Sequence, residues 1–338
     1  MHREHGEISL PGIPATPLRQ GARQLAARLI HARGFGSVEL VHELIRRTLE
    51  RVAEDQEIRT ADEAEALLLK AAVQWLRSAG PEAARALGGV TPQACGELAL
   101  RLSQEETPGR EERGVQTQHL LYLCAHPAVT PEGQHALLLR LGMWLPPAVV
   151  ARLLGTGAGS IPLRIRRAAR RLRAVRRPTL TLDADGAQEL SSRTIAVLEL
   201  LWSILRYAAP FRQGDRRLFD VLTAEALAFA RVLADARSPG SSEAHALLAY
   251  WHLGRARRAR AAPPSDENPE RSMRDGLTHL RAAELGGGTS RFIWLARLQE
   301  VYLLAPNSDE LDWRRLTQLY ERLLPLDGGE AASEPLGE

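Results

Sequence analysis

The sequence contains very little cysteine and no long apolar run. Only Cys95 and Cys124 occur in 338 residues, far apart and without a CxxC pair. Two isolated thiols exclude a disulfide framework and a cysteine-rich zinc site, and they are typical of a reducing compartment. No window approaches the roughly 20 apolar residues of a membrane span, and the first 20 residues lack the apolar core of a signal peptide. We therefore expect a cytoplasmic protein with no membrane partner.

Lysine and strand-like patterns are also nearly absent. Lys70 is the only lysine, so almost all of the 44 basic residues are arginine. We interpret this bias mainly as a sign of a GC-rich genome, although arginine also suits bidentate contacts with phosphate. Apolar residues recur at helical spacing, and runs with a period of two are rare. The predicted fold class is therefore all-α, in two or three domains.

The most distinctive segment, residues 145–177, reads as a short apolar helix, a glycine-rich turn and an arginine-rich helix. One face of the second helix is a predicted buried stripe at spacings of three and four: Ile161, Ile165, Ala168, Leu172 and Val175. Its other faces carry arginine without any acidic residue, so basic charge is concentrated here although the net charge is only +3. A helix-turn-helix that enters a DNA groove has this plan. The alternative is an amphipathic core helix with a solvated arginine face.

The segment before these helices carries short motifs in one continuous register. Their residues are Cys124, His126, Pro127, Ala128, Pro131, Glu132, Ala136, Leu137, Leu139, Arg140 and Leu141. In this register the segment resembles region four of extracytoplasmic-function (ECF) sigma factors, in the branch with a long helical C-terminal extension. The resemblance implies that the helix-turn-helix binds DNA. The candidate DNA-binding residues are Ser160, Arg164, Arg166, Arg167, Arg170, Arg171 and Arg173.

Pro162 restricts where the arginine-rich helix can begin, because proline is tolerated only in a first helical turn. We therefore predict that Gly159 or Ser160 caps this helix. The residues nearest to the base edges would then be glycine, alanine and serine, which have little reach. Contacts with the phosphate backbone are expected, whereas base-specific readout is not.

Residues 18–80 resemble sigma region two in the order and length of their predicted helices. The resemblance places the polymerase-binding helix around residues 41–46, with His42, Glu43 and Arg46 as the candidate contacts with core RNA polymerase. One carboxylate of the family's acidic phrase remains there, and an arginine replaces its glutamine. The next predicted helix, capped by Thr60 or Asp62, corresponds to the family's promoter-melting helix and keeps few basic residues. A helix with fewer basic residues binds DNA phosphates more weakly.

The C-terminal part is predicted to be a helical domain over residues 179–328. Helices are expected at 190–208, 215–236, 241–260, 271–285, 289–304 and 309–324. Their order resembles the tetratricopeptide-like extension of the same sigma branch, an architecture that commonly binds proteins. The full predicted organisation is a disordered N-terminus (1–17), a region two-like domain (18–80), a linker with one short helix (81–115), a region four-like domain (116–178), this helical domain and a disordered tail (329–338).

No residue set in the sequence indicates catalysis, a metal site or a cofactor. The glycines at 155, 157 and 159 follow no predicted strand and precede no GK[ST], which argues against a nucleotide loop. His42-Glu43 lacks the second histidine of HExxH. Asp183 begins a pattern that lacks the glutamate of a calcium loop. Cys124 and His126 are interpreted as packed core residues. We therefore expect a protein that is not an enzyme.

Two functions remain open from the sequence. The first is a sigma-factor-like transcription regulator that binds RNA polymerase and DNA through the helix-turn-helix. The second is a repurposed sigma homologue that no longer melts promoters and acts as an accessory or regulatory protein, with a protein partner on its C-terminal helices.

Overall fold

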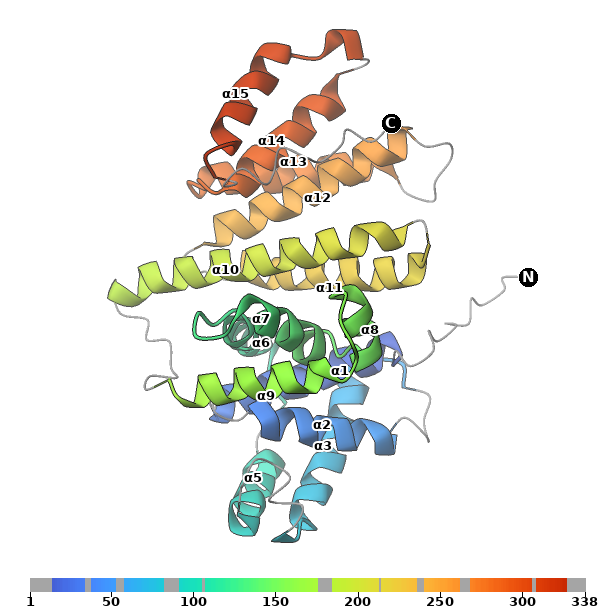
Figure 1. The fold of residues 1–338 in the computed structure, drawn as a ribbon, viewed down its shortest axis with the longest axis vertical. Helices are drawn as coiled ribbons and strands as arrows, with labels where there is room; N and C mark the ends of the chain where they lie inside the picture. The colour runs from blue at the N-terminus through green and yellow to red at the C-terminus, as the bar shows by residue number, and fades with distance from the viewer. Residues whose placement is uncertain are drawn as a thin grey trace, which may run out of the picture. The chain divides into compact units, whose positions relative to one another are not determined.

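The computed structural model describes ten stretches of the chain, and every regular element in them is helical (Figure 1). The described residues are 14–33, 38–52, 58–81, 91–104, 107–175, 184–212, 214–235, 240–261, 268–305 and 308–326. The predicted all-α class is therefore confirmed. The predicted disordered ends lie outside the described residues, except for 14–17, and the prediction is wrong for Thr16 and Pro17, which begin helix α1. The chain forms two compact units, of which the first spans Met1–Leu182 and Glu199–Ala226 and the second spans Asp183–Leu198 and Leu227–Glu338.

Unit 1 contains both segments predicted as sigma-like domains, 18–80 and 116–178. Its elements are α1 (Thr16–Arg33), α2 (Val38–Val52), α3 (Ala61–Arg77), α5 (Pro92–Gln104), α6 (Arg110–Cys124), α7 (Pro131–Leu137), the π-helix η2 (Leu138–Gly142), α8 (Pro147–Leu153), α9 (Ser160–Arg173), the end of α10 (Ala184–Ala208), the 3₁₀ turn η3 (Ala209–Arg212) and the start of α11 (Arg216–Asp235). Helix α1 packs against α2, α3 and α6. Because Leu25, Leu29 and Ile30 of α1 are fully buried at these contacts, α1 joins the two segments through a common core.

The segment predicted as a linker contains helix α5 and the beginning of α6. Cys95, Leu98, Ala99 and Leu102 of α5 recur at helical spacing and are buried, and α5 packs against α3. The short helix expected near 92–102 is thus confirmed, and its apolar stripe explains why it joins the core.

Helix α3 begins at the capping box predicted in part by the sequence. Thr60 Oγ1 accepts from the backbone N–H of Glu63 (3.2 Å), and the Glu63 carboxylate accepts from the Thr60 N–H (3.1 Å). This reciprocal pair satisfies two of the donors left free at a helix start. It fixes the first turn of the helix that lines the groove described below.

Between α7 and α8 the backbone leaves regular α geometry. The π-helix η2 is followed by Trp144, which adopts φ = 51° although it is not a glycine. A bulky residue in this left-handed region costs conformational energy, and such strain is commonly found at functional positions. The Trp144 side chain is buried, so the surrounding packing holds it in this conformation.

Unit 2 is a succession of helices. It comprises the start of α10, the end of α11, α12 (Ser241–Ala261), α13 (Pro269–Leu285), α14 (Arg291–Leu304), the 3₁₀ turn η4 (Ser308–Glu310) and α15 (Trp313–Leu323). Helix α12 packs against α13 and α14, and α14 packs against α15. The six helices expected in the C-terminal part are all present, each within a few residues of its predicted bounds. Whether they form a tetratricopeptide-like array stays a prediction.

Among the described residues, one helix has the length and composition of a membrane span, so the expectation that no segment approaches one is wrong. It covers Glu189–Arg212, and 50% of its apolar window is buried inside the structure. Core helices of soluble proteins have the same character, so this helix is weak evidence for a membrane.

Candidate nucleic-acid interface

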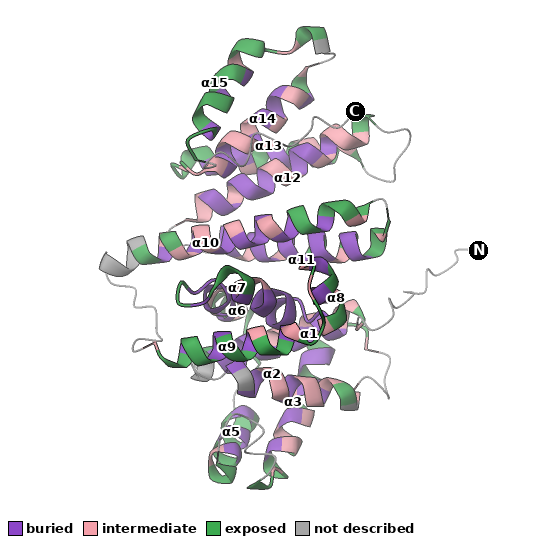
Figure 2. Cartoon of the chain, in the orientation of Figure 1, coloured by how far each residue is buried: buried purple, intermediate pink, exposed green. Residues whose placement is uncertain are grey.

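Helix α9 has a buried face and an exposed face (Figure 2), and the sequence places apolar residues on the first and arginines on the second. Four residues of the predicted stripe, Ile161, Ile165, Ala168 and Leu172, are buried, and Val175 is half-buried. They pack against α7, α8 and α2. The stripe at spacings of three and four is therefore what orients the arginines outward.

The arginine face is exposed along the length of α9. Arg166, Arg167, Arg170 and Arg171 are exposed, and none of them forms an ion pair with another described residue. Arg173 is also exposed. Leu163 lies on the same face and is 45% exposed. Arg166, Arg167, Arg170 and Arg171, which form no ion pair with another described residue, are available to an external anion.

Arg164 differs from the other candidates because it is half-buried. Its charge lowers the pKa of Glu132, which is set first by hydrogen bonds from the Glu132 backbone and from Thr130. Arg164 therefore interacts with a carboxylate of its own chain at the flank of the arginine face.

Ser160 is held in the turn that precedes α9. Gly159 occupies the N-cap position, and no side chain caps the helix. Ser160 Oγ donates to the Gly157 carbonyl (2.7 Å) and lies 2.9 Å from Thr156 Oγ1. Gly155 begins this turn at φ = 59°, a left-handed conformation that glycine adopts without strain. The hydroxyl of Ser160 thus stabilises the turn, and the predicted Pro162 register, with proline in the first helical turn, is confirmed.

The candidate polymerase contacts on α2 are engaged within the chain. Glu43 accepts from Arg46 (2.7 Å) and from Arg47 (2.6 Å), and Arg46 also pairs with Glu50. The hydrogen bond from Arg46 is the main reason why the pKa of Glu43 is lowered. This ladder along α2 leaves no unpaired carboxylate at Glu43.

His42 of α2 contacts Arg140 and Trp144, which lie in the segment 116–178. Arg140 Nη2 donates to His42 Nε2 (2.9 Å), and the imidazole stacks on Trp144 with ring centroids 5.9 Å apart. Burial, and then the charge of Arg140, lower the pKa of His42 to about 4. Arg140 and Trp144 are functional candidates that were not predicted from the sequence. The signal available was an arginine inside the apolar run LLLRLGMWL, because a buried cation needs a partner.

The described residues contain no hydrogen bond or ion pair between the α2 candidates and the α9 arginines. Cys124 is fully buried, which raises the pKa of its thiol, and His126 Nδ1 accepts from the Ala128 N–H (3.1 Å). Neither residue has the geometry of a nucleophile with its base. No three metal-ligating side chains in the described part of the chain converge on one point.

Comparison with known proteins adds no relative. The chain matches no protein-family model, no curated protein and no solved structure. The arginine face of α9 is the surface with the clearest chemical preference, since a row of exposed guanidinium groups attracts phosphate.

Proposed function

We propose that the protein is a sigma-factor-like transcription regulator that binds the DNA phosphate backbone through α9. The observation that carries this proposal is the exposed arginine face of Arg166, Arg167, Arg170 and Arg171, which form no ion pair with another described residue. Each arginine that neutralises a phosphate releases a counterion, and this term supplies most non-specific affinity for DNA. The motif resemblance to region four supports the same conclusion.

The small residues of the turn before α9 limit how the protein could recognise the base sequence of DNA. Base-reading side chains stand at the start of a recognition helix, where this chain has Ala158, Gly159 and Ser160. Ser160 is already hydrogen-bonded within the turn. Binding is therefore expected to depend strongly on salt and weakly on base sequence.

The test compares two quadruple variants with the same net charge. In the first, Arg166, Arg167, Arg170 and Arg171 of α9 are changed to glutamine. In the control, four exposed arginines outside α9 are changed to glutamine: Arg101, Arg110, Arg274 and Arg281. Fluorescence anisotropy of a labelled 20-base-pair duplex gives the dissociation constant between 50 and 200 mM salt.

The α9 variant should bind less tightly, and the slope of log K against log salt should become shallower by about 0.9 for each lost contact. The control should retain the wild-type slope. Equal losses in both variants would mean that net charge alone draws the protein to DNA, and the proposal would then be wrong.

The second candidate function is a repurposed sigma homologue that does not engage the polymerase through α2. The intramolecular pairing of Glu43 with Arg46 and Arg47 favours it, as does the packing of His42 on Trp144. A pull-down against core RNA polymerase separates the two functions, with Glu43→Arg as the test variant and Glu97→Arg on α5 as its charge-matched control. Binding that is lost only in Glu43→Arg supports the sigma-like function. Absence of binding by the wild type supports the repurposed one.

A further inference from the structure

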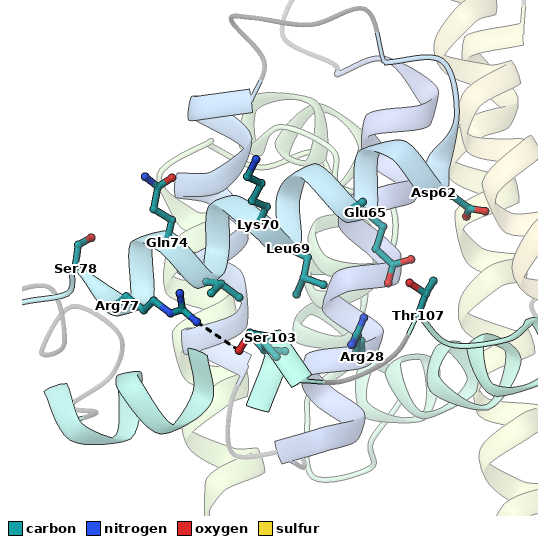
Figure 3. A pocket seen from close by; sticks show the side chains of 13 residues that line it. Arg28, Asp62, Glu65, Leu69, Lys70, Gln74, Arg77, Ser78, Ser103 and Thr107 are labelled. Atoms are coloured by element: carbon teal, nitrogen blue, oxygen red, sulfur yellow. Dashed lines mark hydrogen bonds between the residues drawn. The ribbon is translucent and has the colours of Figure 1, made fainter. Parts of the chain in front are cut away.

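Helices α1, α3 and α5 enclose a groove of about 870 Å³ in unit 1, remote in sequence from α9 (Figure 3). This volume lies within the range of sites that hold small ligands in proteins. Arg28 of α1, Leu102 and Ser103 of α5, and Thr107 line one side. Nothing in the proposed DNA contact uses this groove.

The groove follows one face of α3 along nearly the whole helix. The α3 residues that line it repeat at spacings of three and four: Asp62, Glu65, Ala66, Leu69, Lys70, Val73, Gln74 and Arg77, followed by Ser78 at the C-cap. Asp62 and Arg77 are 15 positions apart along α3, which corresponds to about 22 Å at 1.5 Å per residue. The shape therefore suits an elongated ligand.

Carboxylates line one end of the groove, and arginines neutralise them. Arg113 lies between Asp62 (2.6 Å) and Glu65 (3.1 Å). Glu65 is buried, and burial raises its pKa, which brings the carboxyl closer to its neutral form. Arg28 lies near enough for its charge to oppose this shift. The net charge at this end is thus small, although neither carboxylate oxygen of Glu65 accepts a hydrogen bond from a described residue.

The other part of the groove carries cations without carboxylate partners. Lys70 and Arg77 are exposed, and neither forms an ion pair with a described residue. Arg77 reaches toward α5, where its Nη2 lies 3.5 Å from Ser103 Oγ (Figure 3). Half-buried Leu69 and Val73 and buried Leu102 form an apolar surface between the two ends.

We propose that this groove binds an elongated amphiphile with an acidic head group and an apolar chain. The carboxylate of such a ligand pairs with Arg77, and its chain covers Leu69, Val73 and Leu102. Lys70 adds positive potential halfway along the groove. A cationic head group is disfavoured at the other end, since Lys70 and Arg77 would repel it.

The single lysine of the chain provides a selective probe of the groove. Reductive methylation with ¹³C-formaldehyde labels Lys70 and the terminal amine and preserves the lysine charge. The probes are decanoate and decylammonium at submicellar concentration, which share the chain and differ in the sign of the head group. We expect decanoate to shift the Lys70 methyl signal and leave the terminal one in place. Octanoate should bind about 4-fold more weakly for each methylene removed.

Two variants and one control locate the site. Arg77→Gln should weaken decanoate binding by at least 10-fold, and Val73→Asp should abolish it by placing a charge on the apolar surface. Arg101→Gln removes an exposed cation of α5 that does not line the groove, and it should bind as the wild type does. Circular dichroism checks that each variant keeps its helices.

Three outcomes would overturn the proposal. The first is no shift of the Lys70 signal with decanoate. The second is equal binding of decylammonium, which would show that the head group is not recognised. The third is a stronger Lys70 shift with a single-stranded oligonucleotide that displaces decanoate, which would assign the groove to nucleic acid instead. Loss of duplex binding in the α9 variants leaves these results unaffected, because α9 does not line the groove.

Discussion

The Nε2 atom of His42 on α2 accepts a hydrogen bond from Arg140 Nη2 in η2, at 2.9 Å. An acceptor nitrogen carries no proton, so this bond requires the neutral imidazole with its proton on Nδ1. Trp144 covers the ring from the other side and holds a left-handed backbone conformation. The contact joins residues 18–80 to residues 116–178 through an imidazole, whose ordinary pKa of 6.5 lies near neutral pH.

We predict that acid weakens unit 1 through His42. Its pKa of about 4 lies below the ordinary 6.5, so the unfolded chain binds a proton before the folded chain does. The stabilisation is complete above pH 6.5 and is lost as pH falls toward 4. The expected loss is about 2 kcal/mol, since the half-buried ring keeps some contact with solvent. Urea unfolding of the wild type and of His42→Gln, between pH 7.5 and 4.5, measures it.

Glutamine at position 42 keeps an acceptor for Arg140 but does not titrate. The stability difference between wild type and variant should therefore change with pH and vary most between 6.5 and 4.5. If the two stability profiles stay parallel over this range, His42 is not the titrating group.

A second acid-sensitive contact is expected in unit 2, where His245 and His252 of α12 meet His279 of α13. The Nδ1 atoms of His245 and His279 are 2.9 Å apart, and His252 stacks on His279. Burial first, and then neighbouring positive charge, lower the pKa of His252 to about 4 and also lower that of His279. Arg231 adds to this effect at both rings, whereas Asp275 opposes it. Below pH 6.5 the separated helices bind protons that the packed histidines do not, so acid should loosen α13 from α12.

Hydrogen–deuterium exchange resolves this effect from that of His42, because it reports each helix separately. As the pH falls from 6.5 to 5, exchange of the α13 amides should accelerate, after correction for the intrinsic pH dependence of exchange. His279→Gln should flatten the response in α13 and leave that of α2 unchanged. A uniform change across both units would instead indicate global unfolding.

Gly276 of α13 lies in close contact with Leu253 of α12. A Cβ atom added at Gly276 would lie 2.7 Å from Leu253 Cγ and 3.0 Å from the Leu253 backbone nitrogen. Gly276→Ala should destabilise unit 2 by about 1–2 kcal/mol, because overpacking outweighs the gain in helix propensity. The control is Gly96→Ala on α5, where no atom lies within 4 Å. That change should stabilise the protein by up to about 1 kcal/mol, as measured by thermal unfolding.

Sequence patterns predicted the helices well because the apolar period and the stop signals are local. The stripe of α9, the Thr60 cap and the start of α9 near Pro162 are all decided by residues within one or two turns. The linker was only partly predicted: glycine and proline around residues 80–109 indicated a connection, yet Leu98 and Leu102 bury α5 against α3. Such burial depends on a partner helix distant in sequence.

In the candidate site, too, the features set by local sequence were predictable and the contacts between distant segments were not. The outward position of the α9 arginines follows from helical spacing and was predictable. The engagement of His42 with Arg140 was not, since nearly a hundred residues separate them and the contact depends on the π-helix and the unusual backbone of Trp144. The groove along α3 required three helices to come together. Its α3 lining shows a spacing of three and four, but a sequence alone does not say which helical face remains uncovered.

The α9 arginines should contribute unequally to DNA binding, and the difference is set by burial. Arg170 is exposed and unpaired, whereas Arg164 is half-buried beside Glu132. We predict that Arg170→Gln weakens duplex binding about 3-fold or more and lowers the salt slope by about 0.9. Arg164→Gln should have a smaller effect, because Glu132 already offsets part of its charge. Equal effects, measured by anisotropy at 50, 100 and 200 mM salt, would mean that Arg164 leaves Glu132 when DNA binds. A larger effect of Arg164→Gln would place the DNA on the flank of α9 that faces α7, and the exposed arginine face would lose its role as the main contact.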